Sequence, residues 1–167
     1  MIRLCHRQDE DQIWAIINDA AQAYKGVIPE DRFHDPYMTK EELLHEVESG
    51  VVFWGVEEDG ELVGVMGIQD KGEVALIRHA YVRTARRQGG IGGRLLEHIA
   101  GRVEKPILIG TWEAAVWAIA FYKKHGFALV PAEAKRGLLE RYWQVPERQI
   151  ETSVVLASAG FVPQDYV

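Results

Sequence analysis

Four glycines stand in the five positions 89–93, directly before a segment with helical periodicity. Each glycine destabilises the start of a helix by about 1 kcal/mol relative to alanine, so another interaction must offset this cost. A bound phosphate offers one, because backbone N–H groups at a helix N-terminus point outward and are reached most easily without Cβ atoms. The alternative is a tight turn with close helix–strand packing. A run of four glycines favours anion binding over that alternative.

Basic residues gather around this turn, although the chain has a formal net charge of −6. Arginine side chains add charge and hydrogen-bond donors around a phosphate group. Nucleic-acid binding, in contrast, usually requires a broadly basic surface. The cluster could contact a small polyanion or form the solvated start of a helix, and charge alone does not decide between the two. No nucleic acid is expected as partner. The clustered residues are Arg78, Arg83, Arg86, Arg87 and Arg94.

Two common phosphate-binding sequences do not fit this turn. A Walker loop requires Gly-Lys-Ser/Thr, which is absent, and the Rossmann pattern G-x-G-x-x-G lacks its third glycine in the segment 90–95. The turn also follows an expected antiparallel hairpin rather than a first parallel strand. A nucleoside triphosphate or a dinucleotide is thus the weaker expectation.

The pattern of apolar residues predicts a mixed α/β fold. Asp59-Gly60 between two apolar runs is typical of a β-hairpin, and Thr39 with Glu42 forms a capping box that opens a helix. The predicted order is β-α-α-β-β-β-α-β-α-β-β, with a short surface helix at 132–143. Hairpins and one βαβ unit together predict a single, largely antiparallel mixed sheet of about seven strands with helices on both faces. The predicted strands are 2–6, 51–57, 61–69, 73–82, 107–109, 127–130 and 149–157.

Composition and length narrow the class of protein further. The 167 residues suit one domain, and we expect a single domain over 1–167. Cys5 is the sole cysteine, so no intrachain disulfide can form. The first ten residues lack the apolar run of a signal peptide, and no apolar stretch is long enough for a membrane span. A cytoplasmic protein without a membrane partner is the expectation. The histidines show no metal-ligand spacing, so no metal is expected.

Two motifs together resemble the GNAT superfamily of acyl-CoA N-acyltransferases. Arg87-x-x-Gly90-x-Gly92 matches the signature of that family at its strand-to-helix turn, and the segment 121–127 is similar to its second motif, an aromatic pair before a Gly-Phe turn. Ala115 departs from the family pattern, in which many members carry an asparagine. The resemblance implies a GNAT-like fold and acetyl-CoA as co-substrate. The residues that it implies for binding are Tyr81, Val82, Arg87, Gln88, Gly89, Gly90, Ile91, Gly92, Gly93, Arg94, Ala118, Phe121 and Tyr122.

Tyr122 is the first candidate for catalysis. Its hydroxyl could protonate the departing CoA thiolate or donate a hydrogen bond to it, which is the role that the resemblance implies. His79 and Glu73 are candidates for the base that deprotonates the amine, although water could also take that role. Arg78 and His79 are expected to point to opposite faces of their strand, so that only one faces a given cleft.

The resemblance implies direct acetyl transfer to a primary amine in a ternary complex. A non-catalytic acyl-CoA binding or sensing module is the alternative, and a nucleotide-binding oxidoreductase fragment is a third hypothesis. The acceptor could be a small molecule or a peptide, and the resemblance makes a homodimer one expectation. Aromatic residues in loop-like segments are candidates for an acceptor pocket. They include Tyr24, Phe33, Tyr37, Trp54, Trp112, Tyr142 and Trp143, with His34 beside them.

Overall fold

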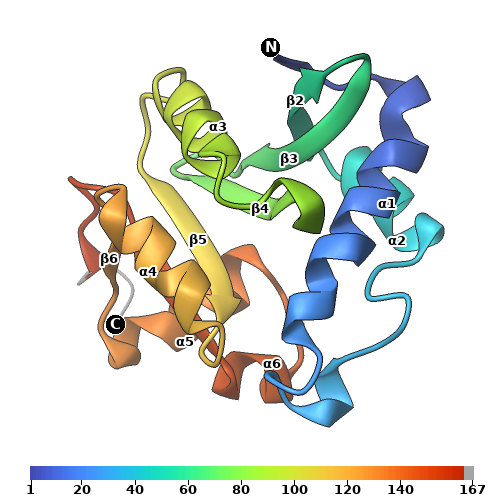
Figure 1. Ribbon diagram of the computed structural model, residues 1–167. Helices are drawn as coiled ribbons and strands as arrows, with labels where there is room; N and C mark the ends of the chain where they lie inside the picture. Colours follow the sequence, from blue (N-terminus) through green and yellow to red (C-terminus); the bar gives the residue numbers. More distant parts are fainter. Residues whose placement is uncertain (164–167) are drawn as a thin grey trace.

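The computed structural model describes residues 1–163 and shows one seven-stranded mixed sheet with the strand order β1-β2-β3-β4-β5-β7-β6 (Figure 1). Neighbouring strands are antiparallel except for β4 and β5, which are parallel. This arrangement confirms the predicted fold class. The strands are β1 (Ile2–Leu4), β2 (Val52–Glu58), β3 (Glu61–Asp70), β4 (Ala75–Val82), β5 (Ile107–Trp112), β6 (Ala128–Leu129) and β7 (Ser153–Ala157).

Helices cover both faces of the sheet. On one face, α3 (Ile91–Ala100) and α4 (Val116–Lys124) share a core with the strands, and Figure 1 shows α4 alongside β5. On the other face, α1 (Glu10–Ala20) and α2 (Lys40–Glu48) pack over β2 and β3. The same face carries α5 (Ala132–Tyr142) and α6 (Glu147–Glu151) over β5 and β7. Neighbouring strand residues enter different cores, as Leu76 and Ile77 do, because side chains alternate along a strand.

Local sequence signals account for several element ends. Thr39 accepts a hydrogen bond from the Glu42 N–H at 3.1 Å, and Glu42 accepts one from the Thr39 N–H at 3.3 Å, which is the predicted capping box. Asp59 and Gly60 both have positive φ, at 53° and 80°, as the tight turn between β2 and β3 requires.

Two predictions near the C-terminus need correction. The predicted strand 149–157 is wrong in its first part, because Glu147–Glu151 forms α6 and β7 begins at Ser153. Pro146 precedes the first residue of α6, where a proline favours helix initiation over strand pairing. The helix near 132–143 is more than a surface element, since it buries Ala134, Leu138, Leu139 and Tyr142.

The sheet departs from regularity at the centre of the molecule. The pairing of β4 with β5 extends only from Ala75–Ile107 to Ile77–Ile109, and both strands continue beyond it with no pairing strand on that side among residues 1–163. The register between β3 and β4 shifts opposite His79, which has a φ of 56° and forms a β-bulge. The bulge and the parting strands lie side by side and open the sheet.

Candidate active site

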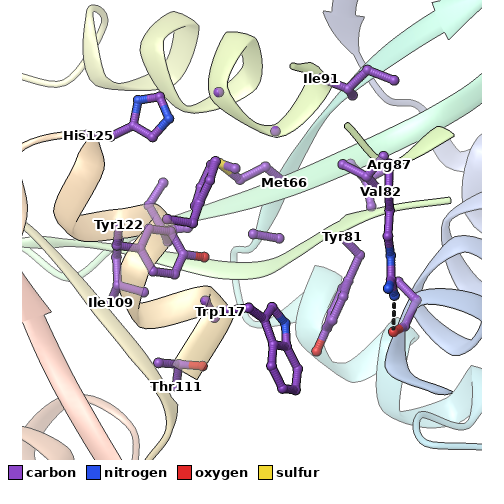
Figure 2. A pocket seen from close by; sticks show the side chains of 18 of the residues that line it. Met66, Tyr81, Val82, Arg87, Ile91, Ile109, Thr111, Trp117, Tyr122 and His125 are labelled. Carbon is purple, nitrogen blue, oxygen red and sulfur yellow. Dashed lines mark hydrogen bonds between the residues drawn. The ribbon is translucent and has the colours of Figure 1, made fainter. Parts of the chain in front are cut away.

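A cleft of about 910 Å³ lies where β4 and β5 part. The end of β4, the first turn of α3 and the inner side of α4 line it, and Figure 2 shows their side chains converging on one space. All but one of the residues predicted to bind acetyl-CoA line this cleft; Gly89 is the exception, within residues 1–163. The two sequence motifs, about 30 residues apart, are therefore brought together on one site.

The first turn of α3 presents unpaired donors to this cleft. Gly90 is the N-cap in the left-handed conformation, with a φ of 73°, and no side chain caps the helix within the described chain. The first three N–H groups, those of Ile91, Gly92 and Gly93, have no carbonyl partner within an α-helix. Gln88 also has a positive φ, of 71°, and alternating left- and right-handed residues form a concave array of N–H groups suited to an anion.

Packing against α4 explains part of the glycine run. A Cβ atom on Gly92 would lie 3.3 Å from Phe121 Cζ, and one on Gly93 would lie 3.0 Å from His125 Cε1. Both glycines therefore allow α4 to approach α3 closely. The alternative of close packing thus applies to these two positions, although the packing partner is a helix rather than a strand. Gly90 is explained differently, because its φ is positive and glycine adopts this backbone conformation without strain.

The arginines of the cluster have partners of their own. Arg86 and Arg94 both form ion pairs with Glu58, while Arg83 donates from Nε to the Leu62 carbonyl at 2.8 Å. Arg87 donates to the Ala20 carbonyl at 3.4 Å, the bond drawn in Figure 2. Glu58 thus neutralises part of the positive charge, and the surplus at the mouth of the cleft is smaller than the sequence alone indicates.

Tyr122 lies on the inner side of α4 with only 6% of its surface exposed. Its hydroxyl points into the pocket in Figure 2 and has no hydrogen-bond partner among residues 1–163. Burial, followed by the nearby Tyr24, raises the pKa of Tyr122 well above its usual range. The hydroxyl therefore remains protonated at neutral pH and is free to donate a hydrogen bond to a ligand.

His79 also lines the cleft, but its orientation differs from the prediction. The bulge turns the side chains of Arg78 and His79 toward the same carboxylate instead of opposite faces. His79 Nε2 lies 3.0 Å from Glu46 Oε1, and the guanidinium of Arg78 lies 3.2 Å from the same oxygen. Burial opposes ionisation of Glu46, but the His79 hydrogen bond and the nearby charges lower its pKa overall.

Glu73 does not belong to this site. It precedes β4 and contacts α5, where its carboxylate accepts hydrogen bonds from Arg141 at 2.7 Å and from the Tyr142 hydroxyl at 3.0 Å. It is absent from the lining of the cleft. The resemblance implies a base on the strand before the glycine turn, which makes Glu73 a candidate, but its partners in α5 hold it outside the cleft.

Three residues of the site were not predicted from the sequence. No sequence motif identifies Glu46 on α2, because the residue that it contacts, His79, lies 33 positions away in the chain. Thr111 lines the cleft because β5 extends beyond the predicted strand. Trp117 stacks on Tyr24 with ring centroids 6.0 Å apart. Its place one helical turn before Phe121, on the predicted helix, is a signal that could have identified it.

Two kinds of feature are absent from the part of the chain that the structure describes. None of the helices there is long and apolar enough to cross a membrane. Residues 1–163 also contain no group of three or more His, Cys, Asp or Glu side chains placed to hold a metal ion.

Comparison with known proteins identifies a family domain within the chain. Residues 49–129 match the family model described as an acetyltransferase (GNAT) domain. A search of curated proteins found no match. Similar solved structures include PaiA N-acetyltransferase from Thermoplasma acidophilum in complex with coenzyme A. Its identity is 17% and its TM-score is 0.71, and the alignment covers 95% of this chain and 97% of that one.

Two further structures have the same fold. The ribosomal-protein-S18-alanine N-acetyltransferase from Escherichia coli is 16% identical with a TM-score of 0.67, over 95% of this chain and 92% of the other. A GNAT family acetyltransferase from Elizabethkingia anophelis with acetyl-CoA bound is 19% identical with a TM-score of 0.61, over 95% of this chain and 96% of the other. Residues 49–129 therefore match an acetyltransferase (GNAT) domain, and the chain has the fold of these solved GNAT acetyltransferases.

Proposed function

We propose that this protein transfers an acetyl group from acetyl-CoA to a primary amine by direct attack in a ternary complex. One observation carries the proposal: a single cleft joins the N-terminus of α3 to the hydroxyl of Tyr122, and neither has a side-chain partner within residues 1–163. The first feature suits the pyrophosphate of a cofactor and the second suits its reactive end. Structural relatives with coenzyme A or acetyl-CoA bound support this choice of cofactor.

The cofactor would extend from α3 toward the opening in the sheet. Its pyrophosphate would accept hydrogen bonds from the first turn of α3. The Arg83 N–H donates to the Val63 carbonyl at 2.8 Å. Since successive strand residues direct their N–H groups to opposite edges, the Val82 N–H points away from β3 toward the opening. The pantetheine arm, which contains amide groups, can pair with this free edge of β4.

His79 is the best-placed base for the amine, with Glu46 as the residue that orients it. An amine must be neutral to attack the thioester, because its ammonium form has no lone pair. The Glu46 carboxylate, 3.0 Å from His79 Nε2, fixes the imidazole and stabilises the imidazolium that forms when it takes the proton. The other ring nitrogen, Nδ1, is left to accept the proton of the amine.

Attack forms a C–N bond and gives a tetrahedral oxyanion, whose collapse breaks the C–S bond and releases the CoA thiolate. Tyr122 would donate a hydrogen bond to that sulfur as its negative charge develops. A thiol has an ordinary pKa of about 8.5, and burial raises the pKa of Tyr122. A hydrogen bond is thus favoured over complete proton transfer, and solvent supplies the proton that completes free CoA.

Thermal denaturation tests cofactor binding first. CoA or acetyl-CoA at a hundred times its dissociation constant should stabilise the fold by about 2.7 kcal/mol, a rise in Tm of roughly 5–10 °C, whereas NAD and ATP should give none. Gly92→Glu should abolish the shift, because it adds bulk beside Phe121 and negative charge at the α3 N-terminus. Gly101→Glu, at the other end of α3, is the matched control and should retain it.

Release of free CoA with a panel of primary amines then tests catalysis. Turnover that Tyr122→Phe reduces while CoA binding persists would support the proposed enzyme. CoA binding without turnover on any amine would instead support a non-catalytic acyl-CoA sensing module. A Tm shift with NAD or ATP alone would refute both functions.

A further inference from the structure

A second cavity, of about 130 Å³, lies on the face of the sheet covered by α5 and α6. It shares His79, Tyr81 and Thr111 with the cofactor cleft, so the two spaces meet at the opening between β4 and β5. Trp143 and Trp112 form part of its wall together with Tyr37, which accepts a hydrogen bond from Trp112 Nε1 at 2.9 Å. Four of the aromatic residues predicted to line an acceptor pocket are therefore here: Tyr24, Tyr37, Trp112 and Trp143.

Polar side chains without partners line this cavity. Ser153, at the start of β7, is only 6% exposed, and its hydroxyl has no hydrogen-bond partner within residues 1–163. Over the same residues, the Gln149 amide and the Thr111 hydroxyl also have none. None of these three side chains has a polar atom that is both enclosed and unpaired, so their hydroxyl and amide groups are open to the cavity. They can therefore form hydrogen bonds with a ligand that enters it.

The charge of the lining narrows the chemistry of that ligand. Arg78 contributes a guanidinium, which donates to Gln69 Oε1 at 3.2 Å and pairs with Glu46 at 3.2 Å. A guanidinium has five N–H donors, so these two contacts leave donors for a ligand. No carboxylate of the described chain lines the cavity, because Glu46 lies behind Arg78 and His79. The lining thus suits a carboxylate, and it contains no carboxylate that could pair with a second ammonium group.

We propose that this cavity binds the acceptor, and that the acceptor is a small free amino acid. This inference rests on the proposed function. The amino group would lie at His79, beside the opening to the cofactor, and the carboxylate would lie among Arg78, Ser153 and Gln149. A volume of about 130 Å³ equals roughly four water molecules at ~30 Å³ each, so the part of the ligand inside the cavity has only a few heavy atoms, as a small amino acid does.

Acetylation kinetics with three acceptor classes test the inference. The probes are single L-amino acids, putrescine as a diamine, and a tripeptide with a free N-terminus, each with acetyl-CoA. We expect kcat/KM for at least one amino acid to exceed that for putrescine and for the tripeptide by tenfold or more. Higher activity on putrescine or on the tripeptide would overturn the assignment of the acceptor while leaving the acetyltransferase intact. Failure to bind CoA would refute the proposed function itself.

Two substitutions then test the cavity as the binding site. Ser153→Ala and Gln149→Leu should each raise KM for the amino acid about 3- to 10-fold, the effect of one lost hydrogen bond. Neither should change the Tm shift given by CoA, which shows that the variant is folded. Ser49→Ala makes the same change on the exposed end of α2 and should leave KM unaltered. An unchanged KM in both cavity variants would show that the amino acid binds elsewhere.

Discussion

Asp9 provides a quantitative test of the structure outside the active site. It is 4% exposed, and its carboxylate accepts hydrogen bonds from the Arg3 guanidinium at 2.9 and 3.0 Å and from the His6 N–H at 2.7 Å. Chiefly through Arg3, these contacts lower the pKa of Asp9 from 3.8 to about 2. One pKa unit corresponds to about 1.4 kcal/mol, so the ionised carboxylate stabilises the fold by roughly 2.5 kcal/mol.

We expect Asp9→Asn to lower the free energy of unfolding at pH 7 by about 2 kcal/mol, and the Tm by roughly 5–8 °C. The pKa is lower in the folded state, so this stabilisation is present above pH ~4 and is lost as the pH falls through ~2. Urea denaturation at pH 7, 4 and 2.5 should therefore show that the free energies of unfolding of the wild type and of Asp9→Asn converge at the lowest pH.

Asp11→Asn, two residues later in the first turn of α1, is the matched control. Asp11 is exposed and, within residues 1–163, pairs only with the exposed Lys40 at 3.1 Å, so its loss should cost less than about 1 kcal/mol. Two results would refute the reasoning. One is an equal effect of both substitutions at pH 7, and the other is an Asp9→Asn deficit that persists undiminished at pH 2.5.

Four further predictions concern the site and the half-buried His98. Tyr122→Phe should lower kcat about 100-fold with little change in CoA affinity, as measured by CoA release and titration calorimetry. Glu46→Gln should lower kcat more than it raises the KM of the amine, because the imidazole of His79 loses the carboxylate that orients it. Trp117→Ala removes the ring that stacks on Tyr24 and should weaken acetyl-CoA binding several-fold in the same calorimetric titration. An unchanged affinity would show that Trp117 is not part of the binding surface. Burial and then Arg102 lower the pKa of His98, so the wild type should lose stability as the pH falls from 7 to 5. His98→Gln should reduce that loss in thermal denaturation, and an identical pH dependence of the two proteins would contradict this prediction.

Features encoded by neighbouring residues could be predicted from the sequence. The capping box at Thr39, the hairpin at Asp59-Gly60 and the glycine turn before α3 each depend on residues a few positions apart, and each lies where it was expected. The sheet followed from the same signals, because apolar alternation, hairpins and one βαβ unit leave few topologies.

Features that depend on tertiary contacts could not be predicted. The bulge at His79 places a non-glycine residue at positive φ, and nothing in the local sequence demands it. Without the bulge, Arg78 and His79 would point to opposite faces, and Glu46 would not be recognised as their shared partner. The positions of Glu73 and Gly93 were likewise decided by distant side chains, Arg141 and His125.

The parting of β4 from β5 also bears on the order in which substrates bind. A continuous sheet would force both substrates to use one entrance, so that whichever arrived second would have to pass the first. Here the larger space and the smaller cavity share lining residues of both strands at the opening between them, and each extends to a different face of the sheet. Under the proposed function, neither substrate obstructs the path of the other. Initial-rate kinetics should then show sequential binding without an obligatory order, with each product leaving by the route through which its precursor entered.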